Sequence, residues 1–123
     1  MIAVDSSSLV SYFSGDVADD VAAVRLALAS SQLALPLAVV TEVLSDRAAA
    51  AIETDILKLA TLPILDGYWH RAGIARRTLQ IRGLKARLGD ALIAQSCIDH
   101  DVALITRDKD FQHFAKHCGL KLA

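Results

Sequence analysis

Cysteine, proline and aromatic residues are scarce in this 123-residue sequence. It contains two cysteines, two prolines, three phenylalanines, two tyrosines and one tryptophan. The cysteines, Cys97 and Cys118, are too few for a disulfide framework, and neither stands in the spacing of a zinc-binding Cys/His set. Free thiols of this kind are typical of a reducing compartment. We therefore expect a cytoplasmic protein that is stabilised by its core rather than by covalent cross-links.

Long apolar runs and an excess of charge of one sign are also missing. No segment approaches the roughly eighteen uncharged residues that a membrane span needs. The sequence opens Met-Ile-Ala-Val-Asp, without the basic segment and apolar run of a signal peptide, so we expect none. The net charge is −1, and no overall basic field attracts nucleic acid. Any attraction to phosphate must come from a local patch.

Apolar residues, in contrast, are abundant. They make up 54% of the chain, while charged residues make up 22%. This balance excludes a disordered chain, which would be poorer in apolar residues and more strongly charged. The length suffices for one core and not for two. We expect one domain that spans residues 1–123.

Short β-prone runs alternate with amphipathic segments along the chain. Strands are predicted at residues 2–4, 33–35, 64–65, 102–105 and 120–122. Helices are predicted directly after Asp5, with Ser6 to Ser8 as caps, and at residues 17–29, 38–51, 57–62, 68–81, 91–98 and 111–117. Strands separated by helices favour right-handed crossovers and a parallel sheet. The predicted fold class is α/β, a single three-layer α/β/α domain with a central, mostly parallel sheet.

Three acidic residues stand near the predicted carboxyl edge of this sheet. Asp5 ends the first strand, Asp108 closely follows the strand at 102–105, and Asp90 begins a helix at the same level. In open α/β sheets the functional crevice lies beyond the carboxyl ends of the strands. Glu42 lies about one turn into the helix after the second strand, which is close enough to point into the same crevice. The sequence therefore predicts a pocket lined by four carboxylates.

Such a pocket predicts a bound cation, because several carboxylates repel each other unless a positive charge neutralises them. Oxygen-only ligands select hard ions such as Mg²⁺ or Mn²⁺. A zinc site is disfavoured because the four histidines and two cysteines are scattered along the chain.

Each acid also has an ordinary structural alternative. Asp5 and Asp90 are good residues for helix N-caps, and Asp108 for a turn. Glu42 would ordinarily lie on a solvated helix face. Taken singly, none of the four assignments is specific, and the hypothesis depends on their combination.

Four segments of the chain carry a family resemblance. They are Ile-Ala-Val-Asp-Ser-Ser-Ser-Leu (2–9), Leu-Pro-Leu-Ala-Val-Val-Thr-Glu-Val-Leu (35–44), Gly-Asp-Ala-Leu-Ile-Ala-Gln (89–95) and Leu-Ile-Thr-Arg-Asp-Lys-Asp-Phe (104–111). In this order and over this length, they resemble the motifs of PIN-domain nucleases. Each motif is weak alone, but the ordered set is specific. The chain length and the residues of the motifs are most similar to those of the VapC toxins of bacterial and archaeal toxin–antitoxin pairs.

The resemblance implies a function and a set of site residues. The catalytic and metal-ligating residues that it implies are Asp5, Glu42, Asp90 and Asp108. It implies secondary roles for Ser6 and Thr106, as hydroxyls beside the metal or its water, and for Asp110, as a less constant acid. The implied reaction is hydrolysis of RNA, in which Mg²⁺ or Mn²⁺ acidifies a bound water and neutralises charge on the phosphate. The implied partners are a cognate antitoxin protein and a second copy of the chain in a homodimer.

A basic segment precedes Asp90. Between Asp66 and Asp90 there is no acidic residue, and six of the thirteen Lys and Arg residues fall there: Arg71, Arg76, Arg77, Arg82, Lys85 and Arg87. The last three lead directly into Asp90 and are predicted to bind RNA, because Lys and Arg hold phosphates without reading sequence. The alternative is a solvated helix face and connection. Tyr68 and Trp69 either stack on bases or pack in the core.

Other functions fit less well. A phosphatase of the haloacid dehalogenase type needs a second Asp two positions after Asp5, and Ser7 stands there. A phospho-receiver domain needs an acidic pair at the first strand and a late Lys in a different order. A serine hydrolase is disfavoured because the serines at positions 6–8 have no plausible His/Asp partners. A PIN-fold module that binds nucleic acid without cutting it stays open, although acids at all four motif positions argue against it.

Overall fold

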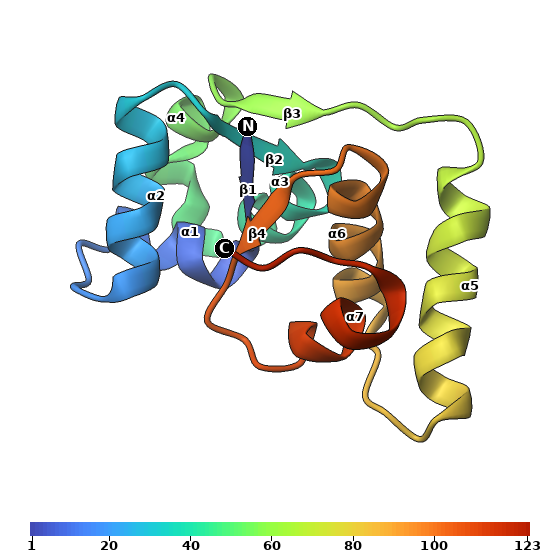
Figure 1. Cartoon of the computed structure of the whole chain (residues 1–123). Helices are drawn as coiled ribbons and strands as arrows, with labels where there is room; N and C mark the ends of the chain where they lie inside the picture. The colour runs from blue at the N-terminus through green and yellow to red at the C-terminus, as the bar shows by residue number, and fades with distance from the viewer.

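Four short strands form a single sheet in the computed structural model, which describes residues 1–123 (Figure 1). The strands are β1 (Ile2–Val4), β2 (Leu33–Pro36), β3 (Ala60–Leu62) and β4 (Ala103–Ile105), in the order β3-β2-β1-β4. Every adjacent pair is parallel. The predicted α/β class and parallel sheet are confirmed.

Seven α-helices surround the sheet. They are α1 (Ser6–Phe13), α2 (Asp19–Ala29), α3 (Leu37–Leu44), α4 (Glu53–Leu57), α5 (Tyr68–Ile81), α6 (Leu88–Asp99) and α7 (Phe111–Cys118), with a 3₁₀ helix, η1 (Arg47–Ala51). Helices α1 and α2 lie on one side of the sheet, and α6 lies on the other side (Figure 1). Helices α5 and α7 pack against α6. This arrangement gives the three predicted layers.

Strands β1, β2 and β4 are apolar and mostly buried, whereas two of the three residues of the edge strand β3 are exposed. All four residues of β2 are buried, and Ala3, Val4 and Leu104 are completely inaccessible to solvent. Continuous apolar character of this kind is typical of parallel strands between two helical layers. Burial of this sheet fixes its carboxyl edge, where the loops that carry the predicted acids begin.

The region between β2 and α5 differs most from the sequence prediction. The helix expected at 38–51 ends at Leu44, and Asp46 then caps η1 by accepting a hydrogen bond from the amide of Ala48 at 2.8 Å. The helix expected at 57–62 is wrong, because α4 ends at Leu57 and β3 follows it. The strand expected at 64–65 is also wrong, since the strand lies at 60–62. The position of this strand depends on its pairing with β2, which a local sequence pattern does not reveal.

Smaller differences occur at the ends of elements. The strand expected at 120–122 forms only one bridge, between Leu122 and Leu104. Asp5, and not the serines after it, caps α1. The helix expected at 91–98 begins earlier, at Leu88. The helix expected at 68–81 has those bounds, and Gly83 follows it with a φ of +72°, which suits glycine.

Two further features concern the thiols and the helix lengths. Both cysteines are free; Cys97 is buried and Cys118 is half-buried. None of the helices combines the length and the apolar character that crossing a bilayer requires.

Candidate active site

Asp5 is placed by the junction between β1 and α1. Its carboxylate is buried, with 3% of the residue exposed, and it accepts a hydrogen bond from the amide of Ser8 at 2.9 Å. The hydroxyls of Ser7 and Thr106 also donate to it. The capping interpretation of Asp5 is confirmed, and Asp5 also lines the acidic pocket; its role as a metal ligand stays a prediction.

Thr106 connects two of the predicted acids. Its hydroxyl donates to Asp5 and accepts from the amide of Asp108 at 3.0 Å. Asp108 in turn accepts from the amide of Asp110 at 2.9 Å, which closes a turn after β4. This chain of hydrogen bonds fixes the loop after β4 against the end of β1.

Glu42 and Asp90 come from α3 and α6. Ser6 donates to Glu42 at 2.7 Å, which points this carboxylate towards the end of β1. Gly89 lies against it, since a Cβ at that position would be 3.0 Å from Glu42 Oε2. Asp90 lies in the first turn of α6 and is not its N-cap, which is Arg87. The capping alternative for Asp90 is therefore wrong.

These elements bring the four predicted carboxylates to one cavity. Its volume is about 170 Å³, and its lining residues are Asp5, Ser6, Ser7, Glu42, Arg87, Asp90, Ile93, Asp108 and Phe111. Asp110 is not part of this lining. One carboxylate oxygen each from Asp90, Asp108 and Asp110 nevertheless lie within 4.8 Å of one another. The structure thus gathers all five acids named from the sequence, and their catalytic and ligand roles stay predictions.

The charge of Asp90 shows how strongly the acids interact. Burial, followed by repulsion from Asp108 and Glu42, raises the pKa of Asp90 to about 6, and nearby Arg87 partly offsets this rise. Desolvation and like charges disfavour the ionised form of a carboxylate. A divalent cation between these oxygens would relieve the repulsion. The donor set, which consists of oxygens only, fits Mg²⁺ or Mn²⁺.

The three cations predicted to bind RNA lie in different surroundings. Arg87 lines the acidic pocket. Lys85 pairs with Asp110 at 3.3 Å. Arg82 lies near the end of α7. Burial is the main cause that lowers the pKa of His117, and the charge of Arg82 lowers it further. The structure therefore brings Arg87 and Lys85 to the acids and leaves Arg82 outside the pocket.

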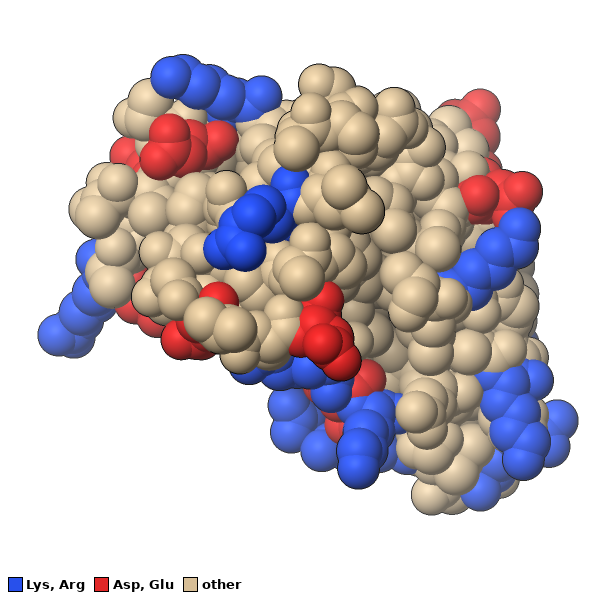
Figure 2. Space-filling model, turned by 60° about the vertical axis from the view of Figure 1, so that its left-hand side comes forward, with Lys and Arg blue, Asp and Glu red and all other residues tan.

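Two further arginines of the basic segment have structural contacts. Arg71 forms a bidentate pair with Asp99, with its shorter contact at 2.7 Å. Arg76 donates to the carbonyl of Ala86 at 2.8 Å, a contact that fixes the connection before α6 and that sequence reasoning missed. Figure 2 shows Lys and Arg side chains gathered along the lower edge of one face, with acidic side chains among them.

Of the two neighbouring aromatics, only one is exposed. Tyr68 is 3% exposed and donates to the carbonyl of Leu92 at 2.6 Å, so it belongs to the core. Trp69 is 67% exposed. It lines an apolar hollow that also borders Glu42. Any contact of this pair with a base or with a partner must therefore be made by Trp69.

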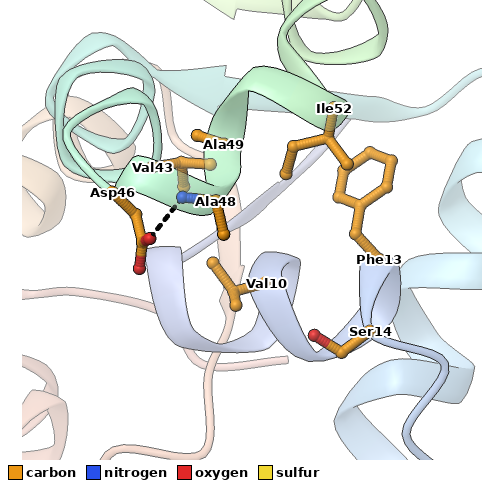
Figure 3. Close-up of a pocket in the computed structure, with 8 residues that line it drawn as sticks. All are labelled: Val10, Phe13, Ser14, Val43, Asp46, Ala48, Ala49 and Ile52. Atoms are coloured by element: carbon orange, nitrogen blue, oxygen red, sulfur yellow. Dashed lines mark hydrogen bonds between the residues drawn. The ribbon is translucent and has the colours of Figure 1, made fainter.

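A separate hollow between α1, α3 and η1 is apolar (Figure 3). Val10, Phe13, Val43 and Ile52 are among its lining residues. Its one carboxylate, Asp46, already accepts the hydrogen bond that caps η1, which Figure 3 draws as a dashed line. A single carboxylate among apolar side chains does not form a metal site, and the acidic pocket remains the candidate active site.

The raised pKa of Asp90 predicts a pH dependence of stability. Between pH 3.8, the ordinary pKa, and about 6, the folded state binds more protons at Asp90 than the unfolded state does. The unfolding free energy of the metal-free protein should therefore fall across this range as pH rises. We expect a loss on the order of 1 kcal/mol, because water screens a half-exposed carboxylate.

The comparison that isolates this effect is wild type against Asp90→Asn, both unfolded with urea in EDTA. Other shifted groups, such as His117, contribute equally to both proteins and cancel in the difference. The difference should change between pH 4 and 7 and then level off. A difference that does not vary with pH would show that folding does not raise the pKa of Asp90.

Comparison with known proteins identifies the family. The family model described as PIN domain matches residues 2–117, so the chain belongs to the PIN domain family. PIN domains are generally nucleases. The match includes all four motifs that carry the resemblance in the sequence.

The fold is also similar to that of a solved complex. A chain in the crystal structure of VapBC2 from Rickettsia felis, bound to a DNA fragment from their promoter, superposes with a TM-score of 0.74 and 21% sequence identity. The similarity covers 100% of this chain and 98% of that chain. At this identity it shows a shared fold. No curated protein matches the sequence.

Proposed function

We propose that this protein is a metal-dependent endoribonuclease and the toxin of a VapBC-type toxin–antitoxin pair that acts in the cytoplasm. The observation that carries the proposal is the convergence of Asp5, Glu42, Asp90 and Asp108 on one cavity at the carboxyl edge of the sheet. Membership of the PIN domain family supports nuclease activity. The fold shared with a VapBC2 chain supports the toxin assignment.

The four carboxylates would hold the ion, and other residues would position them and the RNA. A bound Mg²⁺ or Mn²⁺ would acidify a water and neutralise charge on the scissile phosphate. Ser7, Ser8 and Thr106 hold Asp5 in place with hydrogen bonds. Arg87, which lines the pocket, would donate from its guanidinium to phosphate oxygens.

The experiment that tests this function offers the protein two substrates of the same sequence, an end-labelled single-stranded RNA and the corresponding DNA, with Mn²⁺. We expect internal cleavage of the RNA and little cleavage of the DNA. Cleavage of the DNA alone would contradict the substrate class. Binding without any cleavage would instead favour the nucleic-acid-binding module. The phosphatase alternative needs a carboxylate at position 7, where the hydroxyl of Ser7 donates to Asp5.

Arg87 provides a prediction about RNA binding. Arg87→Gln should weaken binding about tenfold and reduce the slope of log K against log salt by about one, because one phosphate contact is lost. Fluorescence anisotropy with labelled RNA in EDTA, at several salt concentrations, measures both quantities.

The matched control is Arg77→Gln, which removes an exposed arginine of α5 and should leave affinity and slope nearly unchanged. If Arg87→Gln also left both unchanged, the RNA path would not pass this side chain. Contacts from Arg82 and Lys85 to more distant phosphates stay part of the proposal. Neutralising Arg82 and Lys85 together with Arg87 should bring the total slope change to about three at most.

We also propose an antitoxin partner and a homodimer. A basic side chain of the antitoxin would enter the acidic pocket and offset its negative charge. The exposed apolar side chains beside the pocket, which line one hollow, support the dimer. They are Leu37, Ile64, Trp69 and Leu88.

The dimer proposal predicts that the wild type has twice the chain mass in light scattering at micromolar concentration. Trp69→Glu should give a monomer, because it places a charge in the apolar face. Val17→Glu is the control, since Val17 is fully exposed and lies outside this face. A monomeric wild type would remove the dimer from the account.

A further inference from the structure

Asp20, in the first turn of α2, accepts hydrogen bonds from two segments that surround the acidic pocket. Its Oδ2 accepts from the hydroxyl of Ser8 and from Nε of Arg107, each at 2.8 Å. Ser8 belongs to α1, which packs against α2 (Figure 1), and Arg107 belongs to the loop after β4. Asp20 itself does not line the pocket, so any effect that it has there passes through these two residues.

Ser8 connects Asp20 directly to Asp5. The amide of Ser8 donates to Asp5 at 2.9 Å, while its hydroxyl donates to Asp20. Ser8 is completely inaccessible to solvent, and the side chain of Asp20 is only 11% exposed. Because water does not reach this hydroxyl, losing its acceptor would leave it unsatisfied. Asp20 therefore holds Ser8 in the orientation in which its amide reaches Asp5.

Arg107 connects Asp20 to a second residue that holds Asp5. It stands between Thr106, whose hydroxyl donates to Asp5, and Asp108, whose amide donates to Thr106. The arginine side chain is 42% exposed, so the ion pair contributes little to stability by itself. The contact nevertheless restricts the loop, because Thr106 and Asp108 are the chain neighbours of Arg107. Both segments that hold Asp5 are thus tied to one carboxylate of α2.

We propose that Asp20 is a positioning residue for the acidic pocket, which acts through Ser8 and Arg107 to hold Asp5 and the loop after β4 in the arrangement that binds the ion. The inference rests on the proposed metal-dependent function. Residues that orient metal ligands typically affect metal affinity or activity by tenfold or more. Asp19 is the matched control, because it is an exposed acid in the same helical turn and makes neither of these two hydrogen bonds.

The first test needs no metal and follows amide hydrogen exchange of the intact protein by NMR in EDTA. Asp20→Ala should speed exchange at the Ser8 amide by about fivefold or more, as expected when one net hydrogen bond is lost. Asp20→Asn, which keeps an acceptor oxygen, should restore most of the protection. Asp19→Ala should behave like the wild type. Equal acceleration at Ser8 and at the buried Val24 of α2 would show a general loss of stability and would overturn the inference.

The second test measures Mn²⁺ affinity by calorimetry, together with kcat and KM for RNA. Asp20→Ala should weaken Mn²⁺ binding and lower kcat by about tenfold each, while KM changes less than about twofold, because Asp20 does not touch the RNA. Ser8→Ala should have part of this effect. Adding Ser8→Ala to Asp20→Ala should cost little more, because both changes remove the same hydrogen bond.

Three results would overturn the inference while leaving the proposed function in place. They are unchanged Mn²⁺ affinity in Asp20→Ala, a change in KM alone, or effects of Asp20→Ala and Ser8→Ala that add in full. A wild type that binds no Mn²⁺ would overturn the inference and the proposed metal dependence together.

Discussion

Replacing Asp90 with Asn should lower Mn²⁺-dependent RNA cleavage by at least about a thousandfold, because the proposed metal site loses one of its charged ligands. The fold should survive, since Asn has the same shape and Asp90 caps no helix. In metal-free solution the variant should be more stable than the wild type at neutral pH, because it no longer buries a charged carboxylate or repels Asp108 and Glu42. Initial cleavage rates and urea unfolding measure the two effects.

The matched control for this variant is Asp55→Asn. Asp55 is an exposed acid of α4, outside the acidic pocket, and its replacement should leave the rate unchanged. Cleavage by Asp90→Asn at the wild-type rate would show that the assignment of Asp90 is wrong.

Asp5→Asn is expected to be a less specific variant. The Asp5 carboxylate accepts hydrogen bonds from the Ser8 amide and from the hydroxyls of Ser7 and Thr106. An asparagine has only one acceptor oxygen, so part of this set is lost together with the charge. Loss of cleavage in this variant would combine a ligand effect with a weaker cap on α1, and Asp90 is the better residue for testing the chemistry.

Thr106→Val should reduce cleavage about ten- to a hundredfold, because the end of β1 and the loop after β4 lose the hydroxyl that joins them. The change keeps the shape of the side chain but leaves the amide of Asp108 without its acceptor. The unfolding free energy should also fall, by about 1 kcal/mol, because this amide is only partly buried and water can take the place of the lost acceptor. Initial cleavage rates and urea unfolding measure the two consequences.

Thr106→Ser separates the role of the hydroxyl from that of the side-chain volume. It retains the group that donates to Asp5 and should restore most of the rate. Thr78→Val is the control for loss of a threonine hydroxyl, since Thr78 bonds only to the carbonyl of Ile74 within α5. A serine variant as defective as the valine variant would show that loss of the hydroxyl does not by itself account for the effect.

The acidic pocket could be predicted from sequence because its residues follow local signals. Asp5 and Asp108 come after short apolar runs that are strands, and parallel strands end at a common edge. Glu42 lies within a turn or two of the start of a helix that follows a strand. The ordered motifs then connected these positions to one family, and the match over residues 2–117 confirms that family.

Features that depend on contacts distant in sequence could not be predicted. Strand β3 is only three residues long, and its pairing with β2 decides that these residues are extended. The basic segment shows the same limit. Its sequence does not distinguish Arg87 in the pocket from Lys85 at Asp110 or Arg82 near α7, because a helix end and a turn orient each side chain differently.

The most direct test of the central claim, that the carboxylate pocket holds the ion used for RNA cleavage, is a parallel titration with Mn²⁺. The cleavage rate and the binding of the first Mn²⁺ are measured on the same wild-type protein over the same concentrations. The two curves should rise together, EDTA should abolish cleavage, and Asp90→Asn should lose both signals. Cleavage that persists at full rate in EDTA, or that rises independently of metal binding, would contradict the account.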